Sequence, residues 1–163
     1  MPIQLAPISM DDREAVVDIF NYYIEHSNAA YPERPVPYEF FDMLMKMNAG
    51  YPGVVAKDDN SRVIGFGMLR AYNPMPAFAH TAEISYFIKP GYTGHGIGQM
   101  MLEHLISEAK GKGLRVILAG ISSLNDGSIR FHQHHGFVEC GRFQQVGKKN
   151  DQLFDVVWMQ KVL

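Results

Sequence analysis

Three glycines at alternate positions, Gly94, Gly96 and Gly98, separate a strand-like run over residues 82–88 from a helical pattern that begins at residue 97. This turn constrains the fold, because a glycine-rich passage from a strand into a helix brings free backbone N–H groups together at a helix N-terminus. Such a cluster of N–H groups can bind an anion. The sequence therefore predicts a strand, loop and helix that hold a phosphate-bearing ligand, with a flexible turn that binds nothing as the alternative.

The spacing of these glycines disfavours two common phosphate loops. A nucleotide triphosphatase needs a Gly-Lys-Ser/Thr ending for its phosphates and magnesium ion, and this loop lacks one. The third glycine of the dinucleotide fingerprint G-x-G-x-x-G would fall at Gln99 or Met101, so a Rossmann site is disfavoured as well.

Composition limits the class of protein and of partner. The chain has 163 residues, 47% hydrophobic and 20% charged, which favours a single globular domain over residues 1–163. A formal net charge of -2 argues against nucleic acid or an anionic membrane as the main partner, so a small molecule is expected. The single Cys140 cannot form an intrachain disulfide, and neither a leader pattern after Met1 nor an apolar run of membrane-spanning length is evident. These features predict a cytoplasmic protein.

Apolar periodicity and turn residues predict alternating strands and helices. A capping-box-like pair, Ser9 and Asp12, starts a first helix whose apolar face extends to Ile24. Further helices are expected over residues 38–47, 97–109 and 127–135, and strands over residues 3–7, 53–57, 62–69, 80–88, 116–121, 138–144 and 153–162. The strand, helix and strand over residues 80–121 make a right-handed crossover between parallel strands. The expected fold class is α/β, with a mixed, mostly antiparallel sheet and helices on both faces.

Two motifs together resemble one superfamily. Residues 93–98 resemble the pyrophosphate loop Q/R-x-x-G-x-G/A of the GNAT N-acetyltransferases, with Thr93 where that motif has Gln or Arg. The strand over residues 119–121, Asn125 and the short helix that ends at Gly136 and Phe137 look like the second GNAT signature. Within the superfamily, essentially the whole chain resembles the phosphinothricin and methionine sulfone or sulfoximine N-acetyltransferase branch, through residues 80–83, 130–132, 145–147 and 154–155.

This resemblance implies a GNAT fold and acetyl-CoA as cosubstrate. The extended, amide-rich pantetheine arm should pair like an added strand with the backbone of Tyr86, Phe87 and Ile88. The helix dipole favours the pyrophosphate on backbone N–H groups of the loop and first helical turn, and the residues concerned are Thr93, Gly94, His95, Gly96, Ile97 and Gly98. Asn125 is expected either to bond the pantetheine amide or to cap the helix that follows it.

Acetyl transfer to an amine calls for groups that handle protons. An α-amino group has a pKa of about 8 and arrives largely protonated, so a base is useful. Glu83 is the one acid in the strand before the loop, and burial there would raise its pKa toward the working range. In the resembling branch the corresponding Glu is the base, directly or through water. His132 stands four residues before Gly136, where many GNAT enzymes carry a Tyr that assists departure of the thiolate. A solvated strand Glu and a helix-surface His are the alternatives.

The branch implies that acceptor-binding residues lie around the turn before the Glu83 strand. The candidates there are Arg70, Tyr72 and Phe78, while Phe20 and Tyr31 are expected either to wall the pocket or to pack in the core. The turn over residues 72–80 lacks the additional Arg of many members. One arginine favours a zwitterion such as methionine sulfone or sulfoximine over doubly anionic phosphinothricin, because an uncompensated buried charge is costly.

Other interpretations stay open. A zinc site of His132, His135 and Cys140 has no Cys-x-x-Cys pair or acidic third ligand beside it, so no metal is expected. A non-catalytic acyl-CoA-binding or regulatory domain on the same fold would not need both Glu83 and His132. A protein or peptide N-acetyltransferase would need an acidic peptide groove, and none is evident. The resemblance and the apolar run over residues 156–159 together predict a homodimer.

Overall fold

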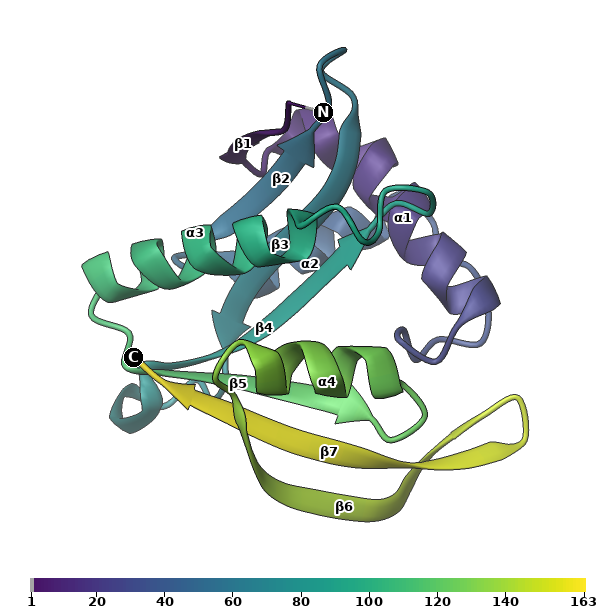
Figure 1. Cartoon of the computed structure of the whole chain (residues 1–163), viewed down its shortest axis with the longest axis vertical. Helices are drawn as coiled ribbons and strands as arrows, with labels where there is room; N and C mark the ends of the chain where they lie inside the picture. Colours follow the sequence, from purple (N-terminus) through teal and green to yellow (C-terminus); the bar gives the residue numbers. More distant parts are fainter. Residues whose placement is uncertain (1) are drawn as a thin grey trace.

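The computed structural model of the protein describes residues 2–163. Within this range seven strands form one sheet in the order β1-β2-β3-β4-β5-β7-β6 (Figure 1). In chain order these are β1 (Gln4–Pro7), β2 (Gly53–Lys57), β3 (Val63–Ala71), β4 (Thr81–Ile88), β5 (Val116–Ser122), β6 (Val138–Lys149) and β7 (Gln152–Val162). Neighbouring strands are antiparallel except β4 and β5, which are parallel. The predicted mixed sheet with one parallel crossover is confirmed.

Helices cover both faces of this sheet (Figure 1). On one face lie α3 (Ile97–Gly111) and α4 (Asp126–His134), and on the other lie α1 (Arg13–His26) and α2 (Phe40–Asn48). Met101 and Leu105 of α3 are fully buried over Gly65 and Gly67 of β3, whereas Val16 of α1 belongs to the core cluster of Phe66 on the other face. Because central strands are covered twice, their residues form apolar runs instead of alternating with polar ones.

Close packing of α3 on the sheet depends on two small residues of β3. A Cβ at Gly67 would lie 3.2 Å from Leu105 Cδ1 and 3.1 Å from Tyr86 Cβ, and one at Gly65 would lie 3.4 Å from Met101 Cε. Larger residues at these positions would push α3 outward. The two glycines therefore determine how closely α3, together with the loop before it, approaches the sheet.

The two parallel strands separate soon after they meet. Pairing between β4 and β5 covers only residues 81–83 and 116–118, although β4 continues to Ile88 and β5 to Ser122. Glu83 is therefore the last residue of β4 that pairs with β5. Beyond it, the backbone of both strands faces a gap in the middle of the sheet.

Most predicted boundaries agree with the structure to within two residues, with one larger exception. The capping box of Ser9 and Asp12 forms, with Ser9 N donating to Asp12 Oδ2 at 2.9 Å, but a 3-10 turn (Met10–Asp12) precedes α1. Strand β6 does not end at residue 144 as predicted; it continues to Lys149 through an irregular pairing between Phe143 and Gly147. Gln145, at φ 54, lies in this irregular stretch, where the sequence pattern of the strand is interrupted.

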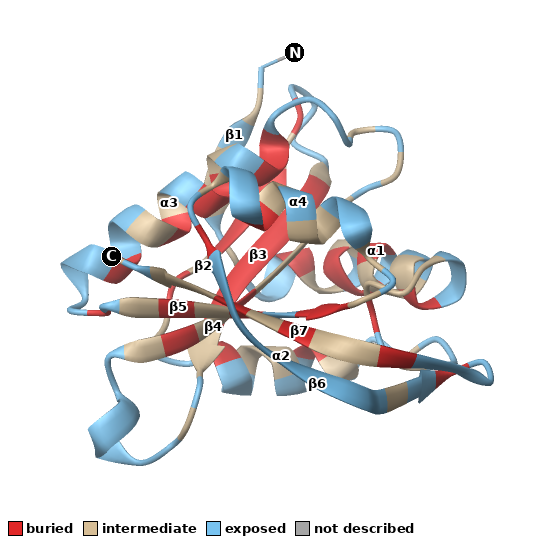
Figure 2. Ribbon diagram, turned by 60° about the horizontal axis from the view of Figure 1, so that its bottom comes forward, coloured by how far each residue is buried: buried red, intermediate tan, exposed pale blue. Residues whose placement is uncertain are grey.

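Strand β6 forms one edge of the sheet, and its residues are exposed along most of its length (Figure 2). Val138, Phe143 and Val146 are among the exposed large apolar residues of this edge. Among the helices of residues 2–163, none has both the length and the apolar character required to span a bilayer.

Candidate active site

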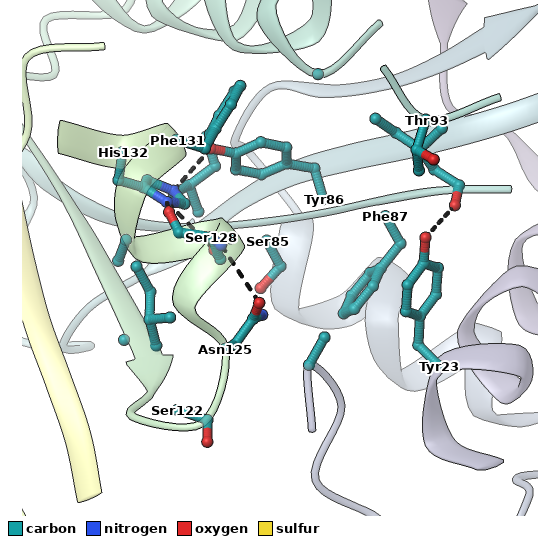
Figure 3. A pocket seen from close by; sticks show the side chains of 18 of the residues that line it. Tyr23, Ser85, Tyr86, Phe87, Thr93, Ser122, Asn125, Ser128, Phe131 and His132 are labelled. Carbon is teal, nitrogen blue, oxygen red and sulfur yellow. Dashed lines mark hydrogen bonds between the residues drawn. The ribbon is translucent and has the colours of Figure 1, made fainter. Parts of the chain in front are cut away.

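A cavity of about 500 Å³ occupies the gap between β4 and β5 and extends to the glycine loop. Its walls come from β4, β5, the loop and the first turns of α4. Lys89 N donates to Ile64 O across the β3–β4 pair, so by alternation the N–H and C=O groups of Tyr86 and Ile88 face the gap while those of Phe87 face β3. Tyr23 of α1 already donates its hydroxyl to Ile88 O (Figure 3). Of the three residues predicted to pair with pantetheine, Tyr86 thus directs both free backbone groups toward the cavity, Ile88 directs only its N–H, and Phe87 directs neither.

The loop over residues 90–96 gives this cavity its anion-binding end. Gly94 and Gly96 both have φ +79, a left-handed conformation that favours glycine, and a Cβ added to either would meet open space. Thr93, Gly94 and Gly98 line the cavity, His95 and Gly96 are exposed on the loop, and Ile97 is buried beneath α3. The first N–H groups of α3 have no partner within the helix and point out of its N-terminus, so the loop suits a phosphate.

Asn125 has the capping role that the sequence left open to it, and one of its side-chain atoms remains available for the other role. Its Oδ1 accepts the backbone N–H of Ser128 at 3.3 Å, which makes it the N-cap of α4. The residue also lines the cavity, where its amide nitrogen remains a donor (Figure 3).

His132 is buried and held from both sides (Figure 3). Its Nδ1 lies 2.7 Å from Ser128 O, and its Nε2 lies 2.7 Å from the hydroxyl of Tyr86. A carbonyl oxygen can only accept, so Nδ1 carries the proton and, in the neutral ring, Nε2 accepts from Tyr86. Burial lowers the pKa of His132, the bond to Ser128 opposes this, and nearby His135 lowers it further. The ring is therefore neutral near pH 7 and presents no free proton at Nε2.

A second cavity of about 420 Å³ lies on the α1 and α2 side of the sheet. Its lining includes aromatic and methionine side chains from α1, α2, β3 and β7, namely Phe20, Phe40, Met43, Met47, Phe66, Met68 and Trp158. The two cavities share a wall made of Ala29, Tyr31, Ile84, Ser85, Phe87 and Gly120. A ligand in one can therefore approach a ligand in the other where β4 and β5 separate.

Three polar side chains stand together in this second cavity. Arg70 and Glu83 are cross-strand partners, with Arg70 Nε 3.7 Å from Glu83 Oε2, and Arg70 Nη1 donates to Ser85 Oγ at 2.6 Å. Burial raises the pKa of Glu83, and the Arg70 guanidinium partly opposes that rise. The carboxyl is 19% exposed and thus accessible to a substrate amine. Glu83 has the partial burial that a base working near neutral pH requires.

The predicted acceptor residues do not all come together. Phe20, Tyr31 and Arg70 line the second cavity, whereas Tyr72 and Phe78 pack edge to face on each other at 5.8 Å and line neither cavity. The sequence analysis missed Ser85, although its position two residues after Glu83 on a strand puts both side chains on one face. It also missed Met43 and Met47, whose helical spacing is equally typical of core packing.

The chain's own groups fit acetyl-CoA as a ligand of the first cavity. Two open left-handed glycines leave room for a pyrophosphate, and the free edge of β4 at Tyr86 and the amide of Asn125 can bond an extended, amide-rich arm. Across residues 2–163, no group of three or more His, Cys, Asp or Glu side chains is arranged to hold a metal ion.

A groove with a phosphate-binding end, joined to a separate pocket that holds a candidate base, suits an enzyme that transfers a group from a nucleotide-bearing carrier to a second substrate. Comparison with known proteins gives the family. The chain belongs to the acetyltransferase (GNAT) family, whose model matches residues 16–137. The fold and family predicted from the glycine loop and from residues 119–137 are confirmed, and with them the prediction of an acetyltransferase.

Similar proteins extend over nearly all of the chain. It is 33% identical over 156 residues to the L-methionine sulfoximine/L-methionine sulfone acetyltransferase of Salmonella typhimurium, covering 91% of this chain and 88% of the relative. It is 32% identical over 153 residues to the L-amino acid N-acyltransferase MnaT of Escherichia coli, covering 91% and 87%. A crystal structure of the phosphinothricin acetyltransferase (Pat) from Sinorhizobium meliloti in complex with AcCoA matches with a TM-score of 0.93 and 28% identity, covering 100% of this chain and 89% of that one.

Proposed function

We propose that this acetyltransferase moves the acetyl group of acetyl-CoA to the α-amino group of a small amino-acid-like acceptor of the methionine sulfone, methionine sulfoximine or phosphinothricin type. The observation that carries the proposal is the position of Glu83. It lies in the second cavity, which shares a wall with the first, and it is the last residue of β4 that pairs with β5 before the two strands separate. The names of the relatives support the acceptor class.

In this arrangement Glu83 acts as the base. Its carboxylate takes a proton from the acceptor's ammonium group, because only the neutral amine can attack the thioester. Burial raises the pKa of Glu83 and so makes the carboxylate a stronger base than an exposed one, while the Arg70 guanidinium partly opposes that rise. The attacking amine comes from the second cavity and the thioester from the first, so the two meet at the shared wall of Ser85 and Gly120.

The second cavity favours an acceptor with an uncharged side chain. Among the described residues that line it, Arg70 is the only cationic side chain, and it is already paired with Glu83. Arg70 can still bind one carboxylate or sulfonyl group through a guanidinium edge. A second anionic group, as in phosphinothricin, would be left uncompensated among methionine and aromatic side chains.

A panel of acceptors tests this proposal. Acetyl-CoA turnover is measured with methionine sulfone, methionine sulfoximine, phosphinothricin, a polyamine and a lysine-containing peptide, by release of free CoA thiol. We expect the two methionine derivatives to give the highest kcat/KM, phosphinothricin to be about 10-fold poorer because of its extra charge, and the peptide to be inactive. Preference for the peptide would favour a protein acetyltransferase, and CoA binding without turnover of any acceptor would favour a regulatory domain.

We also infer the setting in which this enzyme works. Residues 1–163 act as a single acetyltransferase domain in the cytoplasm, in keeping with the composition and the single cysteine. A homodimer is supported by the exposed apolar side chains of the β6 and β7 edge, among them Phe143 and Leu153. Sedimentation should give twice the monomer mass at micromolar concentration, and a monomer there would contradict the dimer.

A further inference from the structure

Tyr86 and His132 form a hydrogen-bonded pair at the cofactor cavity, on the opposite face of β4 from Glu83. Alternation along the strand directs Glu83 and Ser85 to the α1 and α2 side and Tyr86 to the α3 and α4 side. Glu83 lines only the second cavity, whereas Tyr86 and His132 line only the first. The carboxylate that takes the proton of the ammonium group before attack and the Tyr86–His132 pair therefore lie on opposite faces of β4.

The direction of the hydrogen bonds decides what this pair can do. Ser128 O accepts from Nδ1 of His132, and Nε2 of the neutral ring accepts from the Tyr86 hydroxyl. With its own proton directed at His132, the Tyr86 oxygen keeps its lone pairs available to a ligand in the cavity. Phe131 and Phe137 pack against His132, with ring centroids 5.4 Å and 4.9 Å away, and shield the pair from water. In its resting state the pair is thus a proton acceptor.

We propose that Tyr86 is a proton-relaying residue of the acetyl transfer, working with His132 as its proton store. As the amine nitrogen bonds to the acetyl carbon, its surplus proton passes to the Tyr86 oxygen while the Tyr86 proton moves to His132 Nε2. When the carbon–sulfur bond breaks, His132 returns its proton to the Tyr86 oxygen, and Tyr86 delivers one to the thiolate. One N–H bond is broken and one S–H bond is formed, and both residues end as they began.

The relay rests on the proposed function, and it explains how a neutral, buried His132 assists the thiolate. Nitrogen and sulfur are both bonded to the same carbon during the exchange, and the relay requires that the Tyr86 hydroxyl reach both atoms from the first cavity. His132 alone could not donate, since its Nε2 has no proton until the relay supplies one. Ser128 then stabilises the charged ring through the carbonyl that already holds Nδ1.

The tautomer of His132 in the parent protein provides a test that needs no substrate. Long-range proton–nitrogen NMR of the ligand-free protein, with His132→Gln to assign the signal among the seven histidines, should show Nδ1 protonated and Nε2 bare near pH 7. A proton on Nε2 of the neutral ring would overturn the relay, because the pair would then already be arranged as a donor.

Turnover of Tyr86→Phe provides the second test. We expect kcat to fall about 100-fold with little change in KM for acetyl-CoA, and the Nε2 signal of His132 to move to that of a nitrogen without a donor. Tyr51→Phe is the matched control, because Tyr51 packs against the same core, lines neither cavity and makes no side-chain hydrogen bond with the described residues.

An undiminished kcat in Tyr86→Phe overturns the relay alone, whereas a parent protein without turnover overturns the proposed function and the relay with it. If Tyr86→Phe does not fold, the tautomer of the parent protein decides.

Discussion

The two cavities of this protein are built from different parts of the chain's chemistry. The first is bounded by strand backbone, by the glycine loop and by a helix N-terminus, all within residues 84–132 apart from Tyr23, Ala29 and Tyr31. The second is bounded by side chains of α1, α2, β3, β4 and β7, and its lining residues range from Phe20 to Trp158. In the function that we propose, backbone groups of the first cavity bind features that every molecule of CoA shares, while side chains of the second select the acceptor.

The difference teaches where substitutions will act. A change in the glycine loop of the first cavity should alter binding of any CoA ligand whatever the acceptor, and a change in the second cavity should alter base strength or acceptor choice and leave CoA binding intact. The following substitutions test that division.

The largest effect is expected at Gly96, where valine would have to adopt φ +79 and place its side chain in the space open to a phosphate. We expect Gly96→Val to weaken CoA binding about 100-fold or more, measured by calorimetry. Gly113→Val is the matched control, because Gly113 has φ +81 and open space at the other end of α3. Equal losses of affinity in the two variants would mean that backbone strain, not the phosphate site, is responsible.

The next effect is expected at Glu83, on the rate of acetyl transfer. Because burial raises its pKa, the carboxyl keeps its proton to a higher pH than usual, and the rate should rise with pH as that proton is lost. Glu83→Gln should lower kcat about 100-fold and remove this acid limb, while CoA affinity stays at the parental value. The pH dependence that comes from protonation of the acceptor's own amino group persists in Glu83→Gln. A small loss that does not vary with pH would show that Glu83 is not the base.

The smallest effect is expected at Arg70, whose guanidinium lowers the pKa of Glu83 against the effect of burial. Arg70→Met removes that opposition, so the acid limb of the rate should move to higher pH, and KM for the acceptor should rise about 10-fold through loss of one charge-assisted contact. Arg142→Met serves as control, since Arg142 pairs with Glu139 and Asp155 at the exposed β6 and β7 edge. If the acid limb of the rate does not move in Arg70→Met, the guanidinium of Arg70 does not control the pKa of Glu83.

Local patterns predicted the fold well because each depends on residues close together in the chain. The capping box at Ser9, the end of α3 near Gly113 and the Asn125 cap all form as their residue types suggest. The extent of β6 was wrong, because Gln145 and Gly147 interrupt the strand pattern and only pairing with β7 carries the strand past them. Pairing partners are set by the sheet and not by neighbouring residues.

The sequence by itself determined the loop-lined cavity that we propose for CoA. A glycine loop between strand and helix works through backbone geometry, which the order of residue types specifies directly. Tertiary structure alone decided other features: that Arg70 pairs with Glu83, that Tyr72 and Phe78 lie outside both cavities, and that Tyr86 donates to His132 across 46 positions of the chain. The physical reason is that these contacts depend on strand register and on the separation of β4 from β5, which arise only when the sheet is assembled.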